Sequence, residues 1–143
     1  MNILVIDAQG GGIGKQLVTS IKQHVPEAHV IAVGTNNTAT AAMLKAGANE
    51  AATGENSVVV GCRRADIIVG PIGIIIADAM LGEVTPKMAL AVAQSDAKRI
   101  LIPFQHCDNI IVGISDFSTG TLIQSAIEEI LNTPSANPKP SAV

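Results

Sequence analysis

The hydrophobic positions of this chain alternate between short continuous runs and stripes with helical spacing. The first run covers residues 3–6, and a glycine cluster separates it from apolar residues three and four positions apart, at Ile13, Leu17, Val18, Ile21 and Val25. Continuous runs of this length are typical of strands buried on both faces, whereas the wider spacing is typical of a helix with one buried face. The first 25 residues therefore predict a strand, a glycine turn and a helix that ends before Pro26.

The same alternation continues along the chain. We expect further strands at residues 29–33, 49–52, 66–69, 98–104 and 110–114. We expect helices at residues 35–46, from Asn56 or Ser57 to Arg64, at 74–81, from Thr85 onward and from Ser118 or Thr119 to Leu131. Gly82 would divide the crossover after the fourth strand into two helical pieces.

Strands that alternate with helices in this way predict a parallel sheet covered by helices on both faces. The fold class is therefore α/β, a single-domain, three-layer, Rossmann-like fold with a mostly parallel sheet of five or six strands in an order near 3-2-1-4-5. We assign this domain to residues 1–133. Residues 134–143 contain three prolines and little to bury, which predicts a flexible C-terminal tail.

The composition narrows the classes of function. A net charge of -3 and an aromatic content of two Phe, with no Tyr or Trp, argue against a nucleic-acid partner. Cys62 and Cys107 form no CxxC motif, which fits a reducing cytoplasm and gives no metal site. No apolar stretch is long enough for a membrane span, and no signal peptide precedes the first strand. The high apolar content favours a homo-oligomer with the 74–81 helix or the final helix at the contact.

The candidate binding site is the turn from Asp7 to Gly14, because glycine lets backbone amides approach a phosphate closely. The turn is not a P-loop, since Gln9 and Gln16 stand where that motif needs a glycine and a hydroxyl, and it does not match a strict GxGxxG. The alternative is that these glycines only allow tight packing of a strand against a helix.

Other loops should meet this turn at the carboxyl edge of the sheet. Thr35 and Asn36 follow the second strand without a carboxylate, so NAD, NADP or another nucleotide would be tolerated, although both residues are equally explained as helix caps. The predicted cofactor-binding residues, with a small phosphorylated ligand as partner, are Asp7, Gln9, Gly10, Gly11, Gly12, Ile13, Gly14, Gly34, Thr35, Asn36, Gly70, Pro71 and Gly73.

No catalytic set assembles from the sequence. His106 follows the 98–104 strand and is the candidate general base, with an exposed loop histidine as the alternative. Cys107 is interpreted as inert, and Asp78 and Glu83 as solvated surface acids. Lys15 could contact a phosphate or be merely solvated. Arg63 and Arg64 precede a strand, at the opposite end of the sheet from the predicted crevice.

Two resemblances bear on the function. Residues 8–14 resemble the GxxxGxG turn of short-chain dehydrogenases, with Ala8 in the first glycine position, but that family uses a catalytic tyrosine and this chain has none. Residues 7–16, 65–74 and 77–89 together are similar to a small bacterial family catalogued only as a domain of unknown function. The second resemblance implies a Rossmann-like fold and no mechanism.

Three functions remain open at this point. The first is a nucleotide- or dinucleotide-binding protein with the ligand phosphate at the Asp7–Gly14 turn. The second is an oxidoreductase subunit that uses NAD(P) with a substrate site supplied by a partner. The third is a structural or assembly protein with no ligand, in which the glycines serve packing.

Overall fold

The computed structural model describes residues 1–103 and 109–134, which fold into five strands, five α-helices and one 3₁₀ helix. The chain order is β1 (Asn2–Asp7), α1 (Gly12–His24), β2 (His29–Gly34), α2 (Asn37–Lys45), β3 (Glu50–Thr53), α3 (Glu55–Arg64), β4 (Ile67–Pro71), η1 (Ile72–Ile75), α4 (Pro86–Gln94), β5 (Lys98–Ile102) and α5 (Thr119–Leu131). None of the helices in these two ranges is long and apolar enough to cross a membrane.

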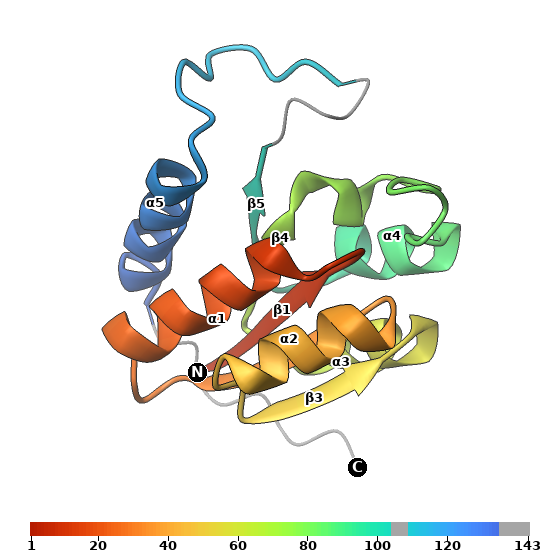
Figure 1. Ribbon diagram of the computed structural model, residues 1–143, viewed down its shortest axis with the longest axis horizontal. Coiled ribbons are helices and arrows are strands. Elements are labelled where there is room, and N and C mark those ends of the chain that lie inside the picture. Colours follow the sequence, from red (N-terminus) through yellow and green to blue (C-terminus); the bar gives the residue numbers. More distant parts are fainter. Residues whose placement is uncertain (104–108, 135–143) are drawn as a thin grey trace.

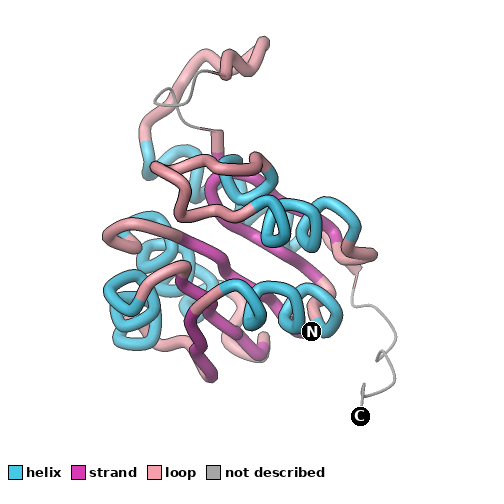
Figure 2. The backbone as a smooth tube through the Cα atoms, turned by 90° about the vertical axis from the view of Figure 1, so that its right-hand side faces the viewer, coloured by secondary structure: helices cyan, strands magenta, loops and turns pink. Residues whose placement is uncertain are grey.

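The five strands form one parallel sheet in the order β3-β2-β1-β4-β5. Helices cover both faces of the sheet, and the edge view of Figure 2 shows the three layers. The chain proceeds from β1 to β2 and β3 on one side of the sheet and then crosses to β4 and β5 on the other, so the strand order reverses at β1. Residues 2–7 of β1 pair with β2, and residues 3–5 pair with β4. This arrangement confirms the predicted Rossmann-like α/β fold.

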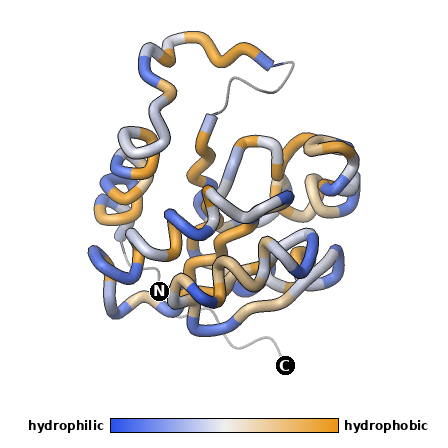
Figure 3. Tube along the Cα trace, viewed as in Figure 1, coloured by the Kyte–Doolittle hydropathy of each residue, from blue (hydrophilic) through white to orange (hydrophobic). Residues whose placement is uncertain are grey.

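β1 lies at the centre of the fold because its side chains supply both hydrophobic cores. Ile3 and Val5 pack in the core under α1 and α5, together with Met43 of α2. Leu4 and Ile6 pack on the other face, under α3 and α4. Successive strand residues point to opposite faces, so a strand covered on both sides reads as a continuous apolar run. The apolar positions gather along the strands and on the inner faces of the helices (Figure 3).

The prediction of a strand at residues 110–114 was wrong. These residues lie in an irregular connection between β5 and α5, which extends beyond the sheet in Figure 1, and Ile110 and Val112 are 92% and 93% exposed. Apolar β-branched residues form a strand only where a neighbouring strand accepts their hydrogen bonds. β5 itself ends at Ile102 rather than at residue 104, next to Pro103, which has no amide hydrogen to donate.

The predicted helix at residues 74–81 was also wrong. The chain forms only the 3₁₀ turn η1 and then a series of turns and bends over residues 76–84, and we call these residues the β4–α4 loop. Asp78, Met80 and Leu81 have left-handed backbones, with φ of 64°, 57° and 58°, and no α-helix contains such residues. The helix at residues 55–64 begins earlier than expected, because Gly54 rather than Asn56 or Ser57 is its N-cap.

Candidate functional site

The turn between β1 and α1 is built around the carboxylate of Asp7. This side chain is 5% exposed and accepts hydrogen bonds from the amides of Ala8, at 2.8 Å, and Gly14, at 2.7 Å. Because the N-cap residue Gly11 has no side chain, Asp7 supplies the oxygen that satisfies an amide of the first turn of α1. Burial raises the pKa of Asp7 above 3.8, and the charge of Glu83 adds to the increase, although the amide hydrogen bonds oppose it.

The four glycines of this turn fall into two classes. A Cβ on Gly11 would lie 2.8 Å from the Cα of Ala39, and one on Gly14 would lie 2.5 Å from the sulfur of Met43. Gly11 also has a φ of 72°, which glycine adopts without strain. These two glycines are therefore explained by the packing of the turn against α2.

Gly10 and Gly12 are different, because neither has a structural reason to be glycine. A Cβ on either would meet nothing within 4 Å, and neither backbone is left-handed. Both residues are exposed, and within residues 1–103 and 109–134 their amide hydrogens have no hydrogen-bond partner. Free amides at or just before the first turn of a helix are suited to binding an anion.

These two glycines open onto a cleft with a volume of about 820 Å³ at the carboxyl ends of β1 and β4. The glycine turn forms one wall and the β4–α4 loop forms the other. The described residues that line the cleft are Asp7, Ala8, Gln9, Gly10, Gly11, Gly12, Ile13, Gln16, Pro71, Ile76, Ala77, Asp78, Ala79, Met80, Leu81 and Asn109. A parallel sheet whose strand order reverses at its centre binds ligands at this position.

Backbone strain is concentrated on the walls of the cleft. Across the described ranges, the non-glycine residues with a left-handed backbone are Gln9, Asp78, Met80 and Leu81, and all four line the cleft. Each such conformation costs on the order of 1–3 kcal/mol and is retained where the surrounding structure or the function requires it. One of the four is on the glycine turn, and the other three are on the loop that faces it.

Glu83 joins these two walls at the side of β2. One of its carboxylate oxygens accepts hydrogen bonds from the amide of Gln9 at 2.9 Å, the hydroxyl of Thr35 at 2.8 Å and the side-chain amide of Asn36 at 2.6 Å. Partial burial acts to raise the pKa of Glu83, but these three hydrogen bonds together lower it below 4.5. The interpretation of Glu83 as a solvated surface acid was therefore wrong.

The structure brings together only part of the predicted site. The Asp7–Ile13 segment and Pro71 line the cleft, whereas Gly34, Gly70 and Gly73 do not. Gly34 and Gly70 are packed against Thr40 and against the carbonyl of Ile6. Thr35 and Asn36 contact Glu83 instead of the cleft, and Asn36 also caps α2 by accepting from Ala39. His106, together with Cys107 and Asp108, lies outside the described residues.

The charges of the cleft favour some ligands over others. Among the lining residues that the structure describes, Asp7 and Asp78 are the charged ones, and no lysine, arginine or histidine is present. The described residues also contain no cluster of side chains suited to a metal ion. The lining offers amide groups, apolar side chains and two carboxylates, which suits non-covalent binding of a ligand with few negative charges.

Comparison with protein families gives one family model that covers almost all of the described residues. A model described as a domain of unknown function, DUF3842, matches residues 2–135. The chain belongs to the DUF3842 family. This result confirms the resemblance to a family of unknown function, and the cleft of this DUF3842 domain lies within the matched residues. Comparisons with curated proteins and with solved structures gave no match.

Sequence reasoning missed two parts of the site. Glu83 and the β4–α4 loop reach the glycine turn across more than seventy positions of the chain, and no spacing motif reports such a contact. Asn109 reaches the cleft from an irregular segment, directly before the residues 110–114 that were predicted as a strand. The local sequence around Glu83 has one usable signal, because the Thr85-Pro86 helix start places residues 82–84 in the loop before α4.

Proposed function

We propose that this protein binds a nucleotide whose phosphate contacts the amides of Gly10 and Gly12. The observation that carries the proposal is that these two glycines face open space, with free amides and no packing contact that requires them. A function in packing alone accounts for Gly11 and Gly14 but leaves Gly10 and Gly12 without a reason. The cluster of left-handed residues around the same cleft supports the proposal independently.

We expect the ribose of the nucleotide to lie near Glu83. In dinucleotide-binding sheets an acidic side chain at the end of the second strand accepts a hydrogen bond from a ribose hydroxyl. Here Glu83, which comes from the β4–α4 loop, occupies that place and is already hydrogen-bonded to Thr35 and Asn36. A mononucleotide and a dinucleotide would each present a ribose to Glu83, so the charge of the cleft rather than this residue distinguishes the two ligands.

The acidic residues that line the cleft also determine which nucleotides we expect to bind more tightly. A monophosphate carries less negative charge than a triphosphate, so it is repelled less by Asp7 and Asp78. We therefore expect AMP or FMN to bind more tightly than ATP. An NAD(P)-dependent oxidoreductase subunit remains the alternative, and it predicts that NAD or NADP binds more tightly than AMP or FMN.

Thermal unfolding in the presence of AMP, FMN, ATP, NAD, NADP and coenzyme A tests the proposal. Circular dichroism must report the transition, because the chain contains no Trp or Tyr. A ligand at one hundred times its dissociation constant adds about 2.7 kcal/mol to the free energy of unfolding. We expect a mononucleotide to raise the melting temperature, and a panel without any shift at millimolar concentrations would overturn the proposal.

The Gly12→Val variant connects any shift to the turn. A valine at position 12 would extend into open space, so the unliganded protein should melt near the wild-type temperature while the ligand-induced shift disappears. Gly120→Val is the matched control, because Gly120 also lies in the first turn of a helix with nothing within 4 Å of its Cβ, but does not line the cleft. This control should keep the full shift. Turnover of a nicotinamide cofactor would favour the oxidoreductase instead.

A further inference from the structure

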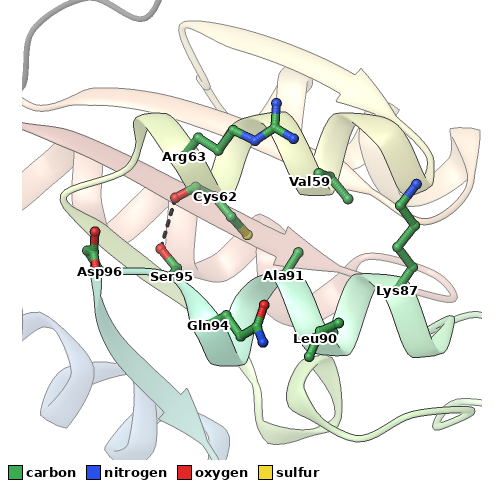
Figure 4. Close-up of a pocket in the computed structure, with 9 residues that line it drawn as sticks. All are labelled: Val59, Cys62, Arg63, Lys87, Leu90, Ala91, Gln94, Ser95 and Asp96. Carbon is green, nitrogen blue, oxygen red and sulfur yellow. Dashed lines mark hydrogen bonds between the residues drawn. The ribbon is translucent and has the colours of Figure 1, made fainter.

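A second concave surface lies on the outer side of the helical layer formed by α3 and α4. The groove between these helices has a volume of about 440 Å³ (Figure 4). Val59, Cys62 and Arg63 line it from α3. Lys87, Leu90, Ala91 and Gln94 line it from α4, and Ser95 and Asp96 complete the end of the groove.

The groove has an apolar floor and an exposed apolar residue on its rim. Cys62 is buried and Val59 and Ala91 are half-buried, so they form an apolar floor. Leu90 stands on the rim of the same groove and is 54% exposed. A surface that carries both a protruding leucine and an apolar groove can satisfy both by pairing with a copy of itself about a two-fold axis.

The charges at the two ends of α4 fit the same pairing. Lys87 is in the first turn of the helix and Asp96 follows its last turn, so both have the sign opposite to the one that the helix dipole favours. Within the described part of the chain neither takes part in an ion pair. Lys87 and Asp96 line opposite ends of the groove, and Leu90 and Ala91 lie between them (Figure 4).

We propose that the α3–α4 face binds a second copy of this chain, with the two α4 helices antiparallel across a two-fold axis near Leu90 and Ala91. Leu90 then enters the groove over Cys62 of the partner subunit. Lys87 faces Asp96 of the partner subunit, and the symmetry forms this ion pair twice. An acidic peptide is the less favoured occupant, because Arg63 and Lys87 would attract it while Asp96 would repel it.

This surface differs from those that the sequence suggested for a homo-oligomer. The predicted 74–81 helix does not form, and the final helix exposes Leu131, which is 57% exposed. Lys98 already pairs with Glu129 beside this end of α5, at 3.6 Å. The α3–α4 face therefore combines exposed apolar area with unpaired opposite charges, which the end of α5 does not.

Sedimentation or light scattering measures the mass of the wild-type chain against that of its variants. We expect twice the 14.6 kDa of the chain for the wild type and a single chain for Leu90→Glu. Leu44→Glu is the matched control, because Leu44 on α2 is 51% exposed and lies away from this face, and it should remain a dimer. A monomeric wild type would overturn the proposal, as would dissociation by Leu131→Glu or Leu81→Glu with Leu90→Glu unaffected.

A charge-reversal experiment tests the antiparallel geometry. Lys87→Glu and Asp96→Lys each place like charges opposite each other twice, so each variant alone should dimerise at least about tenfold more weakly. Mixing the two variants creates a heterodimer in which both pairs are again attractive, since Glu at 87 faces Lys at 96 and Asp96 faces Lys87. Recovery of the dimer on mixing supports the geometry, and an unrecovered mixture contradicts it.

Discussion

The two strand-to-turn junctions of this sheet look alike in sequence and differ in structure. After β1 the chain runs through Asp7–Gly14 into a full helix, and after β4 it runs through Gly70, Pro71 and Gly73 into a 3₁₀ turn. Both begin with a buried apolar strand and continue with glycines. Among the residues that the structure describes, only the glycines of the first junction line the cleft.

The difference lies in what surrounds each glycine. A Cβ on Gly70 would collide with the carbonyl of Ile6 on the neighbouring strand, and a Cβ on Gly73 would lie 2.7 Å from the end of the Met80 side chain. Gly10 and Gly12 meet no atom within 4 Å. A glycine cluster therefore indicates close approach of something to the backbone, and only the contacts show whether the chain itself or a ligand makes that approach.

The largest effect is expected at the second junction. Gly70→Ala forces a methyl group against the backbone of β1 at the centre of the sheet, where neither strand can move freely. Overpacking of a core at a rigid position costs about 3 kcal/mol, so the free energy of unfolding should fall by that amount or the variant should fail to fold. Urea unfolding followed by circular dichroism measures the change. A loss below about 0.5 kcal/mol would show that the two junctions do not differ in this way.

A smaller effect is expected where Glu83 connects the β4–α4 loop to the first junction. Glu83→Gln keeps the shape of the side chain but removes the charge that three donors stabilise, which should lower the free energy of unfolding by about 1 kcal/mol at neutral pH. The carbonyl oxygen of the glutamine can still accept these hydrogen bonds, but each is weaker because the acceptor carries no charge. Urea unfolding of both proteins gives the difference directly.

The pH dependence of that difference identifies the carboxylate. The pKa of Glu83 is lowered in the folded state, so its contribution is present above its ordinary value of 4.5 and is lost as the pH falls through the lowered pKa. The wild type and Glu83→Gln should therefore converge in stability below pH 4.5. Burial raises the pKa of Asp7, which gives it the opposite slope in both proteins, and Glu83→Gln removes only the smaller part of that increase that the charge of Glu83 supplies. A difference that stays constant with pH would exclude the carboxylate as its source.

Much of the fold could be predicted because its main signals are local. The apolar runs of β1, β2 and β4 and the stripes of α1 and α5 each report burial directly, and their alternation determines a parallel sheet. The two errors share a cause. Residues 74–81 and 110–114 are both largely apolar. The conformation of the first segment depends on contacts outside it, and the second has no neighbouring strand to pair with, and the periodicity of the sequence reports neither.

The position of the candidate site could be predicted from the sequence, but the contacts of its individual residues could not. The glycine turn was identified from the residues after β1, whereas the contacts that distinguish its glycines come from Ala39 and Met43 on α2. Thr35 and Asn36 were equally compatible with helix capping and with ligand binding. Asn36 caps α2, and both residues hold Glu83, a partner from another part of the chain.

The smallest effect on stability is expected at Gly10 and Gly12. Gly10→Ala and Gly12→Ala add a methyl group where there is space, and alanine restricts the unfolded chain more than glycine does. The free energy of unfolding should therefore change by less than about 0.5 kcal/mol or rise slightly, while nucleotide binding measured by calorimetry weakens.

Gly14→Ala completes this test as a control on the same turn, because its methyl group would press against Met43 and Asp7 and should destabilise the protein by about 1–3 kcal/mol. The three variants thus separate the glycines that ligand binding requires from the glycine that packing requires, within the eight residues of the turn. If Gly10→Ala or Gly12→Ala were as destabilising as Gly14→Ala, packing would explain the whole cluster. A neutral Gly14→Ala would instead show that the turn can shift away from α2, and the distinction between the two classes of glycine would no longer hold.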